Sequence, residues 1–190
     1  MAWEPTGPIA IRYAALRRTI AYSATFQALT DSATEEQAAE RVIFPDMQYL
    51  PMRPEDPAEG FKYPRTRAII DLKEDQWSIL PVGVGYSEEE YPTVVRLEIR
   101  IPESWQGTNI LDDDVLRNQW CEEMWRAVLQ DMIDASRLGV HPTTGEKFIG
   151  DTCSFAVERE GMVDVTLPEN DIYHETFYAA ELTITDASGV

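Results

Sequence analysis

The side chains best able to do chemistry in this chain are two histidines and two cysteines. His141 lies in an expected turn, and His174 enters an expected strand. Cys121 falls in a long helical pattern and Cys153 on a core-facing strand position, where a thiol behaves as a small buried hydrophobic group. A nucleophile also requires a base and an oxyanion donor, and no such set can be assembled from the sequence. We therefore predict no catalytic residue and no enzymatic activity.

Three further segments could bind a ligand, but a structural role explains each of them better. Gly83-Val84-Gly85 resembles the start of a glycine-rich nucleotide-binding loop, but the third glycine is missing. Acidic residues follow it, and their negative charge would repel a phosphate group. Asp112-Asp113-Asp114 could hold a divalent cation, but no oxygen ligands follow at calcium-loop spacing, and acidic residues complement the start of a helix. Glu88-Glu89-Glu90 is typical of a solvated turn. We predict no cofactor and no metal site.

Two helices are expected near the N-terminus. Apolar residues at helical spacing predict a first helix from about Pro8 to Leu29, with Pro8 suited to its first turn. Ser32 and Glu35 fit a capping box, which predicts a short second helix through about Arg41.

A longer helix is expected to begin at Asp112–Asp114 and to cover the sheet. Arg137 and Gly139 supply its end signal, and Pro142 prevents continuation. Its apolar stripe comprises Leu116, Trp120, Met124, Val128 and Met132, widened by Trp125, Leu129 and Ile133. Its polar side carries Glu122, Glu123, Arg126 and Asp131.

Five segments read as strands, and the clearest runs from Tyr91 to Ile101. There Val95, Leu97, Ile99 and Ile101 alternate with Arg96, Glu98 and Arg100, which predicts one buried face and one wet face. The other segments are 42–44, 66–72, about 147–158 and about 175–185.

The connections are long in two places. Pro45–Pro64 holds five of the twelve prolines, so it is expected to be an extended loop, either a contact arm or a tolerated surface insertion. Trp77–Gly85 is interrupted by proline and glycine, which indicates a bent connection or a short edge strand. Met162–Leu167 is expected to form an extra strand or arm.

The chain is acidic, with 34 Asp or Glu against 16 Lys or Arg in 190 residues and a net charge of −18. Phosphate binding relies on Lys and Arg, so this balance argues against wrapping nucleic acid. Residues 1–30 carry three arginines against Glu4, a net charge of +2, and the remainder carries −20. Either the basic first helix matches the acidic body of a neighbouring copy, or it is a surface helix with scattered arginines.

The sequence predicts a soluble protein made in a reducing compartment. Two distant cysteines fit no disulfide framework or CxxC pattern. No basic stretch precedes an apolar run at the N-terminus, so no signal peptide is expected. The longest uncharged runs, Thr19–Thr30 and Trp77–Ser87, are shorter than the ~20 residues that a membrane span needs.

The predicted fold is a single α+β domain over residues 1–190. A mixed, mainly antiparallel sheet of about four to five strands is covered on one face by the long helix and an N-terminal helix. The Pro-rich loop at 45–64 and a contact arm at 74–90 extend from this domain.

The order of these elements resembles a known family. Tyr22-Ser23-Ala24-Thr25-Phe26-Gln27-Ala28-Leu29 is followed by an Ala/Glu-rich short helix and then by Arg41-Val42-Ile43-Phe44-Pro45. This stretch resembles the opening of the tail terminator proteins of tailed bacteriophages. The later order of hairpin, long helix and hairpin is also similar, so the resemblance covers roughly residues 16–72, 91–138 and 147–185. The Pro-rich loop and the 74–90 connection depart from the family's short forms.

The resemblance implies a structural virion protein at the tail–neck junction, assembled in the host cytoplasm. Such a protein forms a homo-oligomeric, six-fold ring on the last ring of tail-tube protein, stops tube growth and joins the neck or head-completion protein. Genomic DNA passes through without specific binding. Free sheet edges and an acidic inner wall are compatible with this role.

Two alternatives stay open. A head-completion or connector protein of the neck would have the same element order. A small cytoplasmic enzyme or ligand-binding domain could line a pocket with Trp77, Trp105, Trp120 and Trp125, although helical spacing explains Trp120 and Trp125 more simply as core.

Overall fold

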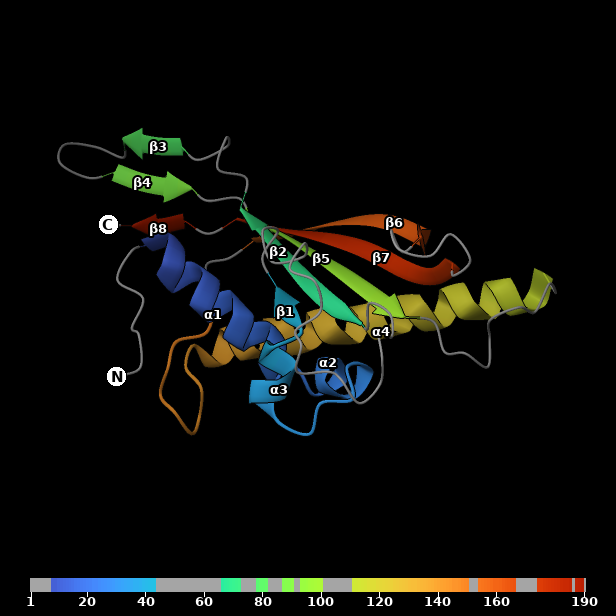
Figure 1. Ribbon diagram of the computed structural model, residues 1–190. Helices are drawn as coiled ribbons and strands as arrows, with labels where there is room; N and C mark the ends of the chain where they lie inside the picture. The colour runs from blue at the N-terminus through green and yellow to red at the C-terminus, as the bar shows by residue number, and fades with distance from the viewer. Residues whose placement is uncertain are drawn as a thin grey trace.

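Helices come first and strands last in the computed structural model, with one long helix between two groups of strands (Figure 1). The structure describes residues 8–43, 66–72, 78–81, 87–90, 93–100, 111–150, 154–166, 174–185 and 187–189. The helices are α1 (Pro8–Tyr22), α2 (Ala24–Leu29), α3 (Glu35–Ala39) and α4 (Leu111–Leu138). The strands are β1 (Val42–Ile43), β2 (Arg67–Leu72), β3 (Ser78–Pro81), β4 (Ser87–Glu90), β5 (Thr93–Arg100), β6 (Ser154–Thr166), β7 (His174–Thr185) and β8 (Ala187–Gly189). The predicted Pro45–Pro64 loop lies outside the described residues.

The N-terminal helix is interrupted at Ser23, so the prediction of one continuous helix to Leu29 is wrong. Ser23 has extended backbone angles (φ −61°, ψ 118°), and its Oγ accepts the N–H of Phe26. A serine side chain competes with helical hydrogen bonding in this way and starts a new helix as its N-cap. The apolar spacing persists across the break because both helices cover the same core.

The cap of α3 is also displaced from its predicted position. Thr34, and not Ser32, is the N-cap, and its hydroxyl accepts the N–H of Gln37 at 3.3 Å. The Gln37 side chain accepts the N–H of Ala33, the residue before the cap, at 2.8 Å, so the arrangement resembles a capping box placed two residues later than predicted. Ser32 instead shares a hydrogen bond with the hydroxyl of Thr30.

In the described part of the chain, the main sheet has five strands in the order β1-β2-β5-β7-β6. β1 runs parallel to β2, and the other pairs are antiparallel. The helices lie on one face of this sheet, with α4 running along it (Figure 1). The predicted α+β class, with a mixed and mostly antiparallel sheet under a long helix and an N-terminal helix, is confirmed.

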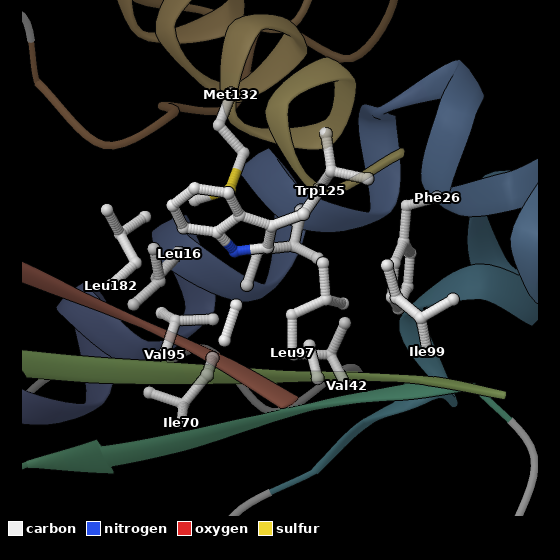
Figure 2. Packing of buried hydrophobic residues seen from close by; sticks show 14 of the residues in the cluster. Leu16, Phe26, Val42, Ile70, Val95, Leu97, Ile99, Trp125, Met132 and Leu182 are labelled. Atoms are coloured by element: carbon white, nitrogen blue, oxygen red, sulfur yellow. The ribbon is translucent and has the colours of Figure 1, made fainter. Parts of the chain in front are cut away.

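The core lies between α4, α1 and α2 on one side and the sheet on the other. Trp125 and Met132 point from α4 toward Val95, Leu97 and Leu182 on the strands (Figure 2). The predicted inward positions of β5 are confirmed, since Val95, Leu97 and Ile99 are all buried. Packing beneath Trp125 leaves a void of only about 10 Å³, room for a single water at most.

The predicted stripe of α4 is wrong at its first member. Leu116 is 57% exposed, whereas Cys121, Trp125, Val128 and Met132 are buried. The reason is length: a helix of 28 residues spans about 42 Å, and the eight residues of β5 span only about 27 Å. The first turns of α4 therefore extend past the end of β5. The predicted end is confirmed, because α4 stops at Leu138 and Gly139 adopts φ +75°.

The outer face of β5 is not uniformly wet, contrary to the prediction. Glu98 is only 5% exposed. Its carboxylate accepts from Nε of Arg67 at 2.7 Å, and Nε of Arg96 lies 3.2 Å from its other oxygen. The alternating pattern correctly predicted which residues of β5 face outward. It could not predict the salt bridges that allow the outward-facing Glu98 to be buried.

A second, three-stranded sheet has the order β3-β4-β8. Glu88, Glu89 and Glu90 form its central strand, so the prediction of a solvated turn is wrong. Part of the Trp77–Gly85 segment is β3, which agrees with the predicted short edge strand. This sheet lies away from the N-terminal end of α4 (Figure 1).

β6 is one strand of 13 residues where the sequence indicated one strand followed by an extra strand or arm. A β-bulge between Arg159 and Gly161 shifts the register, so that pairing with β7 continues to Thr166. The strand begins at Ser154, whereas Lys147 makes only an isolated bridge with Val140. The prediction of a strand from Lys147 is therefore wrong over its first residues. None of the helices in the described part of the chain has the length and apolar character needed to cross a bilayer.

Candidate functional site

The structure places the candidate chemical residues in different parts of the fold. Cys121 is fully buried in α4, and burial raises the pKa of its thiol to about 12, with nearby Arg117 lowering it by less. Asp112–Asp114 form the first turn of α4, and His174 begins β7. Cys153 and Gly83–Gly85 lie outside the described residues. Within the described residues, no three His, Cys, Asp or Glu side chains converge as a metal site would require.

Among the candidates whose side chains the structure describes, His141 makes a direct contact with another titratable side chain. Its Nε2 lies 2.8 Å from Oε2 of Glu35, at the start of α3. The ring packs edge-on against Tyr22 with centroids 5.3 Å apart, and tilted against Phe148 at 5.7 Å. Only 6% of the residue is exposed.

The hydrogen bonds of His141 fix its tautomer. The N–H groups of Thr143 and Thr144 both point at Nδ1, at 3.2 and 3.0 Å. A backbone N–H can only donate, so Nδ1 is an acceptor and Nε2 carries the ring hydrogen, which it donates to Glu35. Both ring nitrogens are thus engaged, which leaves no lone pair for a general base or a metal ligand in this conformation.

The arginines of α1 make contacts within the chain. Arg17 donates from Nε to the carbonyl of Ala39 at 2.7 Å. Arg18 donates to Glu146 at 2.9 Å and to the carbonyl of Lys147. These contacts tie α1 to α3 and to the loop after α4, a role that neither interpretation of the basic helix included.

The edges of the main sheet form a different kind of surface. β1, at one edge, has two residues, whereas β6, at the other, has 13. Within the described residues, β6 is hydrogen-bonded to β7 alone. A long edge strand presents unpaired backbone groups that can bind another strand. The charges and the bulge at Glu158–Gly161 weaken this tendency in its middle.

Within the described residues, the β6–β7 pair extends past the other strands of the main sheet. β5 pairs with β7 only as far as Phe177, whereas β6 and β7 continue for three more residue pairs, from Asp164–Thr176 to Thr166–His174. Figure 1 shows this tip at the same end of the molecule as the start of α4. We call these parts together, residues 111–120 of α4 with 164–166 and 174–176, the distal end.

The distal end exposes apolar side chains. Val115 is 62% exposed and Leu116 57%. Large apolar side chains gathered on a projecting element are typical of a protein–protein contact. The sequence placed Leu116 in the core stripe, and only a comparison of helix length with strand length could have signalled the overhang.

Comparison with known proteins finds no match, either among family models or among curated proteins. The likeness to tail terminators therefore depends on the residue pattern and on the order of elements.

Proposed function

We propose that this chain is a structural protein of a phage tail, a tail terminator that forms a ring on the end of the tail tube. In this role it stops tube polymerisation and joins the tube to the neck. The observation that carries the proposal is the distal end, where a helix overhang and a strand ribbon extend past the core with Val115 and Leu116 exposed. Ordered elements that extend without burying their own apolar residues are expected to contact a partner.

The arrangement of the chain suits a closed ring. A ring of identical subunits needs two different surfaces on each subunit, because each copy contacts its neighbours head to tail. The distal end is one such surface. The β3-β4-β8 sheet, away from the start of α4, is a candidate for the second, since short strands of this kind gain stability by packing against another element (Figure 1).

The charge also fits the proposed role. At −18 per chain, a ring of several copies would surround its channel with negative potential. DNA phosphates would be repelled from such a wall, so the genome would pass without adhering.

The test is ring formation by the purified chain, measured by native mass spectrometry and negative-stain imaging, with and without tail-tube rings. We expect rings, at least on the tube ends, and loss of ring formation in Leu116→Gln. The control is Arg126→Gln, at an exposed position near the middle of the same helix and away from both proposed contact surfaces. Burial of a leucine side chain is worth about a tenfold to hundredfold change in association, which the control should not show.

A chain that stays monomeric and does not bind tube ends would contradict the proposal. If the two glutamine variants had equal effects on ring formation, the distal end would be ruled out as the contact surface. Deletion of the gene separates the terminator from a head-completion or connector protein, because loss of a terminator gives overlong tubes. Loss of a head-completion protein leaves leaky heads beside tails of normal length.

A further inference from the structure

We infer that His141 makes the loop after α4 sensitive to acid: the neutral imidazole holds the Pro142–Glu146 turn closed, and protonation at Nδ1 opens this turn while the contact with Glu35 is kept. This inference concerns a device within the fold and does not depend on the proposed function. It follows from which atoms the two ring nitrogens contact.

The turn is built around the backbone and side chain of His141. The N–H of His141 donates to the carbonyl of Glu146 at 2.7 Å, and the N–H of Gly145 donates to the carbonyl of His141 at 2.9 Å. Gly145 adopts φ +72°, a conformation that suits glycine. Nδ1 accepts the N–H groups of Thr143 and Thr144. Without this acceptor, the two N–H groups at the apex have no partner within the turn.

Protonation and these two hydrogen bonds exclude each other. Nδ1 has a single in-plane lone pair, and a proton taken from solvent occupies it. Nδ1–H is then a donor that faces two other donors, so the amides of Thr143 and Thr144 must turn away. Pro142 to Glu146 are all exposed, so opening brings these amides into water without uncovering the core.

On the opposite side of the ring, protonation strengthens the contact between Nε2 and Glu35. Nε2–H already donates to the Glu35 carboxylate at 2.8 Å, and a positive charge on the ring turns this hydrogen bond into an ion pair. The acid form therefore stays attached to α3. The buried anchors of the loop are separate from the ring: Thr19 Oγ1 accepts the N–H of Ile149, and Ser136 Oγ donates to the carbonyl of Gly150.

Titratable and charged groups near the ring come from three elements, and most are negative or neutral. They are Glu35 and Glu36 on α3, Tyr22 and Arg18 on α1, and Glu146 and Lys147 on the loop itself. Arg18 is paired with Glu146 at 2.9 Å, so its charge is partly compensated where it approaches the loop.

The experiment follows the ring and the turn in one sample by NMR of the full chain, from about pH 8 to about pH 5. The imidazole resonances of His141 report its protonation and tautomer. Hydrogen exchange, corrected for the intrinsic pH dependence, reports the protection of the Thr143 and Thr144 amides. We expect the Nε2–H tautomer at the higher pH. As the ring titrates, both amides should lose about tenfold in protection, the change expected for one hydrogen bond, while the Ile149 amide stays protected.

Two variants separate the two ring nitrogens. In His141→Asn, the side-chain oxygen takes the place of Nδ1 and accepts the same two amides, as asparagine does in turns, but it does not titrate. We expect Thr143 and Thr144 to remain protected across the whole pH range. In His141→Gln, the amide nitrogen reaches toward Glu35 but not the turn, and we expect low protection at every pH.

Three results would overturn the inference. They are a ring that titrates while Thr143 and Thr144 keep their protection, a His141→Asn variant that still opens with acid, and a His141→Gln variant whose turn stays closed. The first result bears on the wild-type chain alone, so the test remains decisive if a variant fails to fold.

Discussion

Asp131 of α4 accepts the hydroxyl hydrogen of Ser23 at 2.7 Å, although the two residues are 108 positions apart in the sequence. The same carboxylate oxygen accepts the N–H of Thr25 at 3.1 Å, so one side chain of the long helix binds the first turn of α2. Ser23 Oγ in turn accepts the N–H of Phe26. The break between α1 and α2 is thus stabilised by hydrogen bonds from a side chain of α4.

Asp131→Asn should lower the free energy of unfolding by about 1–3 kcal/mol. The variant replaces a charged acceptor of two hydrogen bonds with a neutral amide that can orient a donor toward Thr25. Urea unfolding followed by circular dichroism measures the change. Asp134→Asn is the matched control on the same helix, because Asp134 is exposed and accepts hydrogen bonds from Gln130 and Arg137 of α4 itself. Equal losses in the two variants would contradict a special role for Asp131.

Leu97→Asp should prevent folding. Leu97 is buried at the centre of β5, between Ala68 of β2 and Ala180 of β7, and an unpaired carboxylate there costs several kcal/mol against a small total stability. The far-ultraviolet circular dichroism spectrum and the elution volume report the loss of structure. Leu116→Asp, at an exposed position, should fold. A folded Leu97→Asp protein would disprove the core assignment of β5.

Glu98→Gln should destabilise the sheet by about 1–3 kcal/mol. The substitution keeps the shape of the side chain but removes the charge that faces Arg67 and Arg96, and removing one partner of a buried pair leaves the other uncompensated. Thermal and urea unfolding measure the change. Glu123→Gln, on the exposed side of α4, should have an effect near zero. No difference between the two variants would show that the Glu98 pairs contribute nothing to stability.

The Cys121 thiol should resist a thiol reagent in the folded protein and react on unfolding, measured in a Cys153→Ser background. Its pKa is raised to about 12, mainly by burial, above the value of roughly 8.5 for an exposed cysteine. A pKa that is higher in the folded state means that the stabilising contribution is present below about pH 8.5 and is lost as the pH rises toward 12. Cys121→Ala should therefore lose less stability than wild type over that range. Rapid labelling of the folded chain at neutral pH would contradict this assignment.

Local and periodic features were predictable from the sequence. The alternation of Val95, Leu97 and Ile99 gave the inward face of β5, and Gly139 gave the end of α4. These signals depend on neighbours within a few residues. The class of the fold follows from their order along the chain.

Features that depend on distant partners were not predictable in the same way. From the sequence, Ser23 is expected in the middle of a helix, because its hydrogen bond with the distant Asp131 cannot be foreseen. Likewise, Glu98 is expected to be solvated, because its salt bridge with Arg67 cannot be foreseen. The same holds for His141, whose partner Glu35 is 106 residues away. The three glutamates of β4 form a strand because they pair with β3 and β8. A run of glutamates does not by itself predict a strand.

The position of β7 in the sheet has a consequence for biosynthesis. This strand comes late in the chain yet lies between β5 and β6, where it supplies Tyr178, Leu182 and Ile184 to the core. Until residues 174–185 have left the ribosome, the nascent polypeptide lacks the strand that joins β5 to β6, and the part of the core that Tyr178, Leu182 and Ile184 fill stays open. Folding of this sheet is therefore expected to finish only after residues 174–185 have emerged, with a requirement for chaperone protection that rises as synthesis slows.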